Sequence, residues 1–223
     1  MRVAVTGSRG GIGQALLPEL VAAGHEVVGF VRQGGWALDL TWPPERMAAV
    51  VAEAARPPFD VWINLAGADI LSPPLGQAPF EDRLRALWAV DVLGTVRLCR
   101  LVATYLSPGG QVINLGWDDR GAPPTESAQL YGLAKAAVTA YSQHLARAWG
   151  GRWRCNVVAP GWVRTRWAET LPVTRQAWWA HRLPGGRWLE PGEVARAIRR
   201  LAEDPTANGA VVRVQPGTGP ISG

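Results

Sequence analysis

A short apolar run at residues 3–6 leads directly into a glycine-rich turn, and a helical pattern follows it. The glycines of this turn are Gly7, Gly10, Gly11 and Gly13. Apolar residues with helical spacing occupy residues 12–23, and Gly24 supplies a C-terminal cap. A strand that passes through glycines into a helix is the opening unit of an α/β fold, so this segment restricts the fold more than any other.

The rest of the chain repeats the alternation of strand and helix. Further strands are expected at residues 25–31, 36–40, 61–64, 111–115, 155–158 and 210–214. Helices are expected at 44–55, 80–105, 129–149 and 190–202, with a loop and helix region at 160–189. Several strands are continuous apolar runs, which is typical of a parallel sheet covered on both faces. The sequence therefore predicts one Rossmann-type, doubly wound α/β domain over residues 1–223, with about seven strands.

Composition excludes several other classes of protein. Hydrophobic residues make up 48% of the 223 residues, yet no apolar stretch approaches the roughly 20 residues that span a membrane. Two cysteines, Cys99 and Cys155, are too few for a disulfide framework, and three isolated histidines do not indicate a metal site. The net charge of +5 comes from scattered arginines, so no nucleic-acid partner is expected. We expect a cytoplasmic protein with a small-molecule substrate.

The glycine-rich turn predicts a dinucleotide site, because its backbone can approach a pyrophosphate that the helix N-terminus stabilises. The end of the second strand indicates which dinucleotide. An acid there bonds the ribose hydroxyls, whereas an arginine accommodates a 2′-phosphate. This strand ends at Arg32 without a nearby acid, and Arg9 lies in the glycine turn. The pattern favours NADP(H) over NAD(H), with Asp39 and Leu40 placed to contact adenine.

Lys135 is the only lysine among 23 basic residues, and it follows Tyr131 by four positions on one expected helix. An ammonium group beside a tyrosine lowers the pKa of the phenol from about 10 toward the working pH. Such a tyrosine can give a proton to a carbonyl oxygen or imine nitrogen as hydride arrives, or accept one in the reverse reaction. The retained lysine indicates chemistry that arginine cannot copy.

Taken together, the motifs resemble those of the short-chain dehydrogenase/reductase family over essentially the whole chain. They are Thr6-Gly7-x-x-x-Gly11-Ile12-Gly13, Asp39, Asn64-Leu65-Ala66-Gly67, Tyr131-x-x-x-Lys135, Asn156-Val157-Val158-Ala159-Pro160-Gly161 and Pro191-Gly192-Glu193-Val194-Ala195. The resemblance implies an NADP(H)-dependent oxidoreductase acting on a small carbonyl or hydroxyl compound. It implies Tyr131 as general acid/base, with Lys135 orienting the nicotinamide ribose.

The resemblance also implies a cofactor site, a substrate lid and self-association. The implied cofactor-binding residues are Gly7, Ser8, Arg9, Gly11, Ile12, Gly13, Arg32, Asp39, Leu40, Asn64, Ala66, Gly67, Tyr131, Lys135, Pro160, Gly161 and Val163. Residues 162–189 are expected to cover the substrate, and their tryptophans and arginines either bind a flat or anionic substrate or simply pack. Helices 80–105 and 129–149 are expected to form a homodimer or homotetramer.

Two positions depart from the family pattern. The family's serine at the end of the fifth strand, which holds the substrate oxygen, falls here on Trp117 or Asp118, and Ser127 lies too near Tyr131 in sequence to be its obvious replacement. The family's asparagine in the preceding long helix is replaced by Asp91.

Three explanations of these departures stay open. Asp118, thirteen residues before Tyr131, matches the aspartate of pteridine reductases, and quinonoid dihydropteridine reductases also lack the serine. Alternatively, an ordinary carbonyl reductase orients its substrate with Asp118 or a backbone donor. A third possibility is a cofactor-binding or regulatory protein with weak or no catalysis, in which Trp117 fills the pocket.

Overall fold

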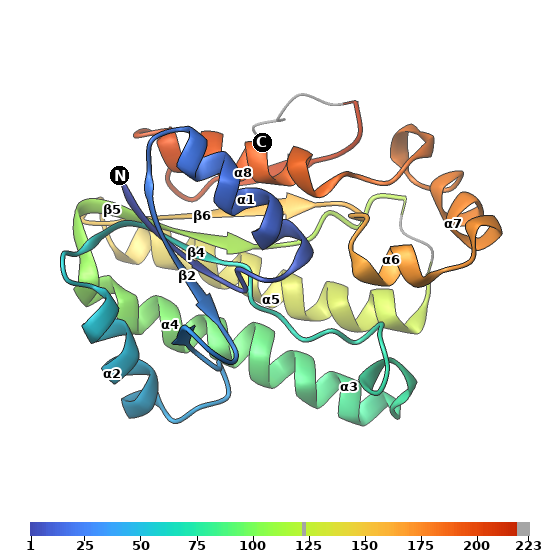
Figure 1. The fold of residues 1–223 in the computed structure, drawn as a ribbon, viewed down its shortest axis with the longest axis horizontal. Helices are drawn as coiled ribbons and strands as arrows, with labels where there is room; N and C mark the ends of the chain where they lie inside the picture. The colour runs from blue at the N-terminus through green and yellow to red at the C-terminus, as the bar shows by residue number, and fades with distance from the viewer. Residues whose placement is uncertain (122–123, 218–223) are drawn as a thin grey trace.

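The sheet of this protein has seven strands, all parallel, in the order β3-β2-β1-β4-β5-β6-β7 (Figure 1). The computed structural model describes residues 1–121 and 124–217. The strands are β1 Arg2–Thr6, β2 Glu26–Val31, β3 Trp36–Ala37, β4 Phe59–Asn64, β5 Leu106–Leu115, β6 Arg154–Pro160 and β7 Val211–Val214. The doubly wound fold expected from the strand–helix alternation is confirmed.

Helices cover both faces of the sheet (Figure 1). On one face, α1 Gly11–Ala22 packs against α8 Pro191–Glu203 over an apolar layer from β1, β4 and β6. The other face carries α2 Pro44–Ala54, α4 Thr95–Val102 and α5 Glu126–Ala148. Because each crossover returns the chain to a parallel strand, the carboxyl ends of all strands gather at one edge.

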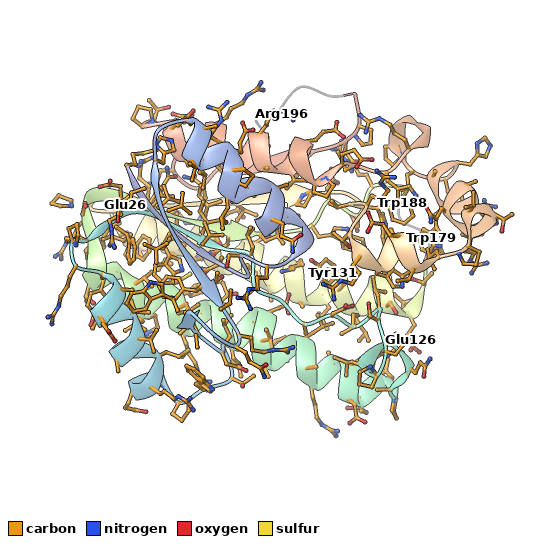
Figure 2. The ribbon with its side chains drawn as sticks, viewed as in Figure 1. Glu26, Glu126, Tyr131, Trp179, Trp188 and Arg196 are labelled. Carbon is orange, nitrogen blue, oxygen red and sulfur yellow. The ribbon has the colours of Figure 1, made fainter. Side chains whose placement is uncertain are left out.

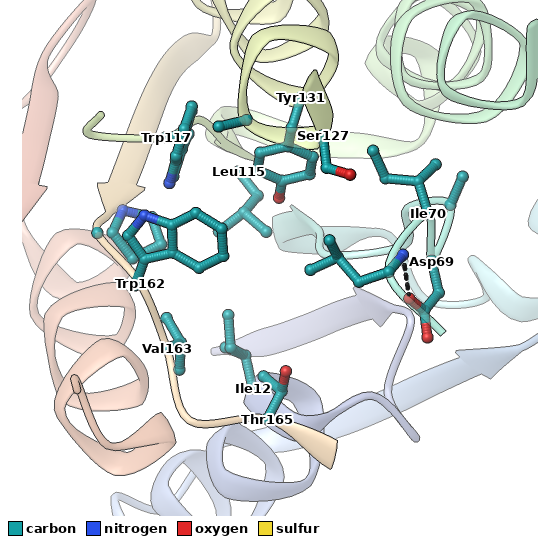
Figure 3. Close-up of a pocket in the computed structure, with 15 residues that line it drawn as sticks. Ile12, Asp69, Ile70, Leu115, Trp117, Ser127, Tyr131, Trp162, Val163 and Thr165 are labelled. Atoms are coloured by element: carbon teal, nitrogen blue, oxygen red, sulfur yellow. Dashed lines mark hydrogen bonds between the residues drawn. The ribbon is translucent and has the colours of Figure 1, made fainter. Parts of the chain in front are cut away.

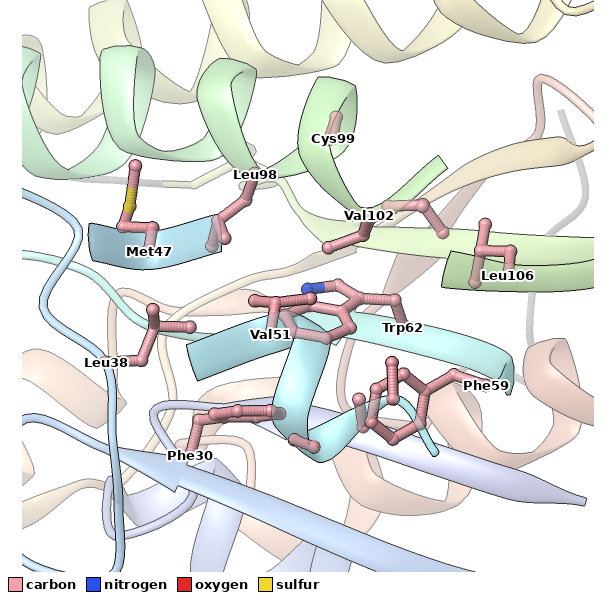
Figure 4. Close-up of a cluster of buried hydrophobic side chains, with 14 of the residues drawn as sticks. Phe30, Leu38, Met47, Val51, Phe59, Trp62, Leu98, Cys99, Val102 and Leu106 are labelled. Carbon is pink, nitrogen blue, oxygen red and sulfur yellow. The ribbon is translucent and has the colours of Figure 1, made fainter. Parts of the chain in front are cut away.

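The second face buries an aromatic cluster (Figure 4). The Trp62 ring of β4 lies 5.0 Å from the Phe30 ring and 5.5 Å from the Phe59 ring, measured between centroids. All three side chains are fully buried, and the Trp62 indole donates to the Asn64 side chain at 2.8 Å. Asn64 in turn donates to Asn114 at 2.8 Å, so its side chain belongs to the core beneath the predicted cofactor site.

The expected helix 80–105 is not a single regular α-helix. It divides into α3 Phe80–Leu87, a π-helical segment η2 Trp88–Gly94, α4, and a 3-10 turn η3 Ala103–Tyr105. At Gly94 the helix passes so close to the turn after β3 that an added Cβ would lie 2.7 Å from Cβ of Leu40. The π-helical segment contains Asp91, and such segments often occur at functional sites.

Other element boundaries differ from the expected ones by a few residues. The third strand, expected at 36–40, pairs over Trp36–Ala37 only, since the chain turns toward α2 after Leu38. β5 begins five residues early, at Leu106, with a register shift against β4. The 160–189 region contains α6 Arg166–Thr170, α7 Val173–Ala180 and the turn η4 Pro184–Gly186. Within the described residues, no helix is long and apolar enough to cross a membrane.

Candidate active site

Two adjoining cavities open at the carboxyl edge of the sheet. The larger has a volume of about 780 Å³ and lies over the glycine turn and the ends of β2 and β4. The smaller has a volume of about 160 Å³ and lies between α5 and the segment that follows β6. Ala68 and Asp69 line both cavities and so mark their junction.

The larger cavity gathers much of the predicted cofactor site. Of those residues, it is lined by Gly7, Arg9, Arg32, Asp39, Leu40, Ala66 and Gly67. Its size falls within the range of cofactor pockets in proteins. Residues that the sequence reasoning missed also line it, among them Gln33, Thr41 and residues 72–75.

Glycine is required at two positions of the turn beneath this cavity. Gly7 has φ +65°, and a Cβ there would lie 2.7 Å from the Ala66 amide nitrogen. At Gly13 a Cβ would lie 2.5 Å from the Gly7 carbonyl oxygen. These close approaches leave a bare backbone at the start of α1, which fits a bound pyrophosphate. The residues present therefore fit a nicotinamide dinucleotide.

Ser8 does not line either cavity. Its side chain is buried and donates a hydrogen bond to the Phe30 carbonyl oxygen at 3.0 Å, which fastens the glycine turn to β2. Gly11 is also absent from the lining of both cavities, and a Cβ there would lie 3.0 Å from Cγ2 of Thr165.

Arg9 and Arg32, which both line the larger cavity, are exposed. Arg9 donates to the Gln33 carbonyl oxygen at 3.2 Å. No carboxylate within residues 1–121 and 124–217 forms an ion pair with Arg9 or Arg32. Asp39 is engaged locally, because its Oδ1 accepts hydrogen bonds from the Thr41 amide and hydroxyl groups.

The smaller cavity is mostly apolar (Figure 3). Its lining residues are Ile12, Ala68, Asp69, Ile70, Leu71, Leu115, Trp117, Ser127, Ala128, Tyr131, Pro160, Gly161, Trp162, Val163 and Thr165. Five of them were predicted as cofactor-binding residues: Ile12, Tyr131, Pro160, Gly161 and Val163. The Tyr131 ring enters from α5 with its hydroxyl directed into the cavity.

Lys135 lies behind Tyr131 and is itself buried. Its Nζ lies 5.3 Å from the centre of the Tyr131 ring and 2.9 Å from Oδ2 of Asp91, whose side chain is fully buried. Oδ1 of Asp91 accepts a hydrogen bond from the Ala68 amide at 2.8 Å, which ties the π-helical segment to the turn after β4. Burial disfavours the charged amine, but Asp91 and Tyr131 together raise the pKa of Lys135 above its ordinary value.

The pKa of Tyr131 corrects one sequence-based expectation. Burial, the largest influence, raises this pKa; the Lys135 ammonium lowers it, and the Asp91 carboxylate raises it again. The resulting pKa lies above that of an ordinary tyrosine, not below it as expected. The expectation failed because it considered the cation alone, without the burial of the phenol, which has the largest effect, and without the Asp91 carboxylate.

Asp118 is not among the residues that line either cavity. Its buried carboxylate forms a two-pronged ion pair with Arg120, with contacts of 2.6 to 3.0 Å, and this pairing lowers the pKa of Asp118 although burial opposes the shift. The predicted catalytic role of Asp118 is therefore without support from the geometry. Trp117 lines the smaller cavity instead, with its ring centre 5.5 Å from that of Tyr131.

Two hydroxyl residues of the smaller cavity were not among the predicted site residues, and one of them, Ser127, had been set aside as too near Tyr131 in sequence. Thr165 follows the predicted Pro160-Gly161 turn by four residues and lies against Gly11 of the glycine turn. Ser127 lies one helical turn before Tyr131 on α5, and its closeness in sequence brings it beside Tyr131 in space (Figure 3). The i, i+4 spacing was the signal that could have identified it.

The expected lid consists largely of a tryptophan cluster. The Trp162 ring lies 4.7 Å from that of Trp179 and 6.2 Å from that of Trp188, and Trp167 packs within 6.1 Å of the same rings. Figure 2 shows Trp179 and Trp188 at the end of the molecule formed by α6 and α7. Of this cluster only Trp162 lines the smaller cavity, so its other tryptophans serve packing.

Comparison with known proteins gives the family. The family model adh_short_C2, described as "Enoyl-(Acyl carrier protein) reductase", matches residues 36–218. An uncharacterized short-chain type dehydrogenase/reductase from Sinorhizobium fredii is 29% identical over 220 residues, covering 90% of this chain but only 40% of that longer protein. Cyclohexanol dehydrogenase from a Rhodococcus species is 29% identical over 92% of this chain and 77% of its own length. The chain belongs to the short-chain dehydrogenase/reductase family.

Solved structures agree with this assignment. The 3-alpha-hydroxysteroid dehydrogenase from Pseudomonas sp. B-0831, complexed with NADH, superimposes with a TM-score of 0.78 at 26% identity, covering 96% of this chain and 95% of its own. A small-chain dehydrogenase in complex with NADPH superimposes with a TM-score of 0.80 at 22% identity and 97% coverage of both chains. The family is one of nicotinamide-dependent oxidoreductases; the resemblance to pteridine reductases finds no support here.

Proposed function

We propose that this protein is an NADP(H)-dependent reductase of small, neutral carbonyl compounds. The observation that carries the proposal is the Tyr131 hydroxyl, which is directed into a small apolar cavity beside the larger dinucleotide cavity. The bound cofactor supplies or accepts a hydride at its nicotinamide ring. Tyr131 supplies the proton to the substrate oxygen, so that ketone, reduced cofactor and one proton give alcohol and oxidised cofactor.

The raised pKa of Tyr131 favours the reductive direction. A phenol with a pKa above 10 stays protonated at neutral pH and is ready to donate. Alcohol oxidation needs the phenolate, so its rate should rise with pH through the alkaline range, whereas the reduction rate should stay level through neutral pH. Opposite profiles would contradict this assignment of Tyr131.

The preference for NADP(H) rests on Arg9 and Arg32. Both line the larger cavity and neither is paired with a described carboxylate, so both are available to a 2′-phosphate. We expect Arg32→Ala to weaken NADPH binding about tenfold in a fluorescence titration and to leave NADH binding nearly unchanged. Arg196→Ala, an exposed arginine on α8 outside both cavities, is the matched control (Figure 2). Tighter binding of NADH than NADPH by the wild type would overturn the preference.

The substrate class follows from the smaller cavity. Aromatic and aliphatic side chains dominate its lining, which includes no lysine or arginine among the residues that the structure describes. Such a surface accepts a compact uncharged ring or chain and gives no partner to a carboxylate or phosphate. The cyclohexanol dehydrogenase among the relatives acts on a compound of this kind.

A turnover screen tests the proposal. Purified protein with NADPH is offered cyclic and aliphatic ketones, quinones and pterins, and consumption of NADPH is followed by absorbance. We expect turnover of neutral ketones, and we expect Tyr131→Phe to lower kcat by about 10²–10⁴-fold with little change in NADPH affinity. Full turnover by Tyr131→Phe would refute the mechanism, and turnover of pterins alone would refute the substrate class.

Self-association is a further part of the proposal. An exposed apolar hollow of about 380 Å³ lies where η2 meets α5, and it is lined by Leu84, Arg85, Trp88, Ala89, Leu93 and Leu133. Trp88 is 43% exposed and Leu133 52%, unusually high values for such large apolar side chains. Sedimentation should show a dimer or tetramer that Leu133→Glu dissociates. The free, buried thiols of Cys99 and Cys155 suit the proposed cytoplasmic location.

A further inference from the structure

The smaller cavity, where the substrate is proposed to bind, contains few groups able to hold a carbonyl oxygen. Among the described lining residues, the hydroxyl and carboxyl side chains are those of Asp69, Ser127, Tyr131 and Thr165. Trp162 adds an unpaired indole N–H, but its six-membered ring edge, not its nitrogen, faces the Tyr131 hydroxyl (Figure 3). Asp69 already accepts hydrogen bonds from the Leu71 and Ser72 amides, at 3.1 and 3.0 Å, and an ionised carboxylate repels the negative charge that develops on the substrate oxygen. Thr165 packs against the glycine turn at the opposite wall from α5. Ser127 is the hydroxyl that lies beside Tyr131.

Ser127 is held by a buried cation. Nη1 of Arg83, on α3, donates to Oγ of Ser127 at 3.0 Å, and the Arg83 side chain is only 11% exposed. Arg83 also pairs with Glu126, the residue before Ser127, so the guanidinium spans the first turn of α5. This arrangement fixes the position of the Ser127 oxygen relative to the helix that carries Tyr131.

The hydrogen bond from Arg83 determines what Ser127 can do. A guanidinium has donors only, so the serine oxygen must act as the acceptor in this contact. Its own proton is then left for another partner, and no acceptor within residues 1–121 and 124–217 takes it. A hydroxyl that accepts from a cation is also polarised, which makes it a better donor.

We propose that Ser127, positioned by Arg83, donates a second hydrogen bond to the substrate oxygen while Tyr131 transfers the proton. This inference rests on the proposed carbonyl reduction. It gives the cavity a pair of donors, one helical turn apart on α5, in a chain whose β5 is followed by Trp117 instead of a hydroxyl residue. Two donors on the developing alkoxide stabilise the transition state more than the neutral ketone.

Steady-state kinetics with a ketone from the turnover screen test the role of Ser127. Removal of one such donor typically costs about 10²–10³ in kcat, so Ser127→Ala should lower kcat by about 100-fold with NADPH affinity unchanged. Ser127→Thr, which keeps a hydroxyl, should recover most of the activity. Ser107→Ala, at the opposite end of β5 from the cavity, is the control for serine removal. Ser127→Ala with a kcat within threefold of the wild type would overturn the inference.

A double-mutant cycle tests Arg83 as a positioning residue. Arg83→Met should lower kcat about tenfold in the wild-type background and should have no further effect in Ser127→Ala, because its influence passes through that hydroxyl. Independent, multiplicative losses would show that Arg83 acts only on structure. A wild type without turnover of any carbonyl compound would overturn the proposed function and this inference together, whereas an active wild type with an active Ser127→Ala variant overturns this inference alone.

Discussion

Replacement of Asp91 by alanine should strongly destabilise the protein, because it leaves the charge of Lys135 buried without its partner. The two groups are 2.9 Å apart, and their side chains are 0% and 5% exposed. Breaking a buried pair by removing one member typically costs about 3–5 kcal/mol, and the Ala68 amide loses its acceptor as well. Against a total stability of roughly 5–15 kcal/mol, this is a large fraction.

Urea unfolding at pH 7, followed by tryptophan fluorescence, measures this cost. The raised pKa of Lys135 means that its contribution is fully present below the unfolded-state pKa of about 10.4 and is lost only as pH rises through the folded value, so pH 7 lies well inside the window. Asp91→Asn keeps an acceptor for the Ala68 amide and should cost less than Asp91→Ala. It also removes the carboxylate that raises the pKa of Tyr131, so the alkaline limit of ketone reduction should move to lower pH.

Asp82→Ala is the matched control for this experiment. Asp82 pairs with Arg85 at 2.9 Å on the surface of α3, where the two side chains are 52% and 72% exposed. An exposed pair of this kind contributes at most about 1 kcal/mol. If Asp91→Ala cost no more than Asp82→Ala, the reasoning about the buried pair would be refuted.

Three further outcomes are expected. Burial raises the pKa of the Cys99 thiol to about 12 and that of Cys155 well above its ordinary value, so neither should react with an aromatic disulfide reagent at pH 8 until the protein is unfolded; fast labelling of the folded protein would contradict this. Gly13→Ala should weaken cofactor binding at least tenfold in a fluorescence titration, because its Cβ would lie 2.5 Å from the Gly7 carbonyl oxygen. Unchanged binding would show that the glycine turn accommodates the added methyl group without losing its shape. The bond with Arg187 lowers the pKa of Glu193 to about 2, so this carboxylate stabilises the fold above the unfolded-state pKa of about 4.3 and loses that effect as pH falls through 2. Glu193→Gln should therefore lower the midpoint of urea unfolding at pH 7 and have a smaller effect at pH 3; an equal effect at both would be inconsistent with the ion pair.

Local sequence patterns were sufficient to predict the order of strands and helices. Apolar strands and glycine turns are encoded within a few residues, so β1, α1 and α8 begin and end within two residues of their expected bounds. The π-helical segment was not predictable, because nothing in the spacing of residues 88–94 separates it from an α-helix. The same is true of the close approach of Gly94 to Leu40, which joins distant parts of the chain.

Contacts between site residues were predictable when both residues belong to one motif. Contacts between residues of different helices were not. Tyr131 and Lys135 share one helix, so their spacing placed them together. The Asp91–Lys135 pair and the Arg83–Ser127 contact each join separate elements, and sequence separation hid both. Asp118 was selected by its distance in sequence from Tyr131, yet that count does not tell which way the side chain faces after β5 ends.

The packing of α1 against α8 has a consequence for the synthesis of the protein. The apolar face of α1, with Leu16 and Leu20, is covered in the finished molecule by Val194, Ile198 and Leu201 of α8. At translation rates of about 5–20 residues per second, roughly 10–40 s separate the two helices as they leave the ribosome. During that interval the apolar face of α1 on the nascent chain is not yet covered by α8 and is exposed to other proteins. Slow codons between the two helices should therefore lower the yield of folded protein, and coexpressed chaperones should restore it.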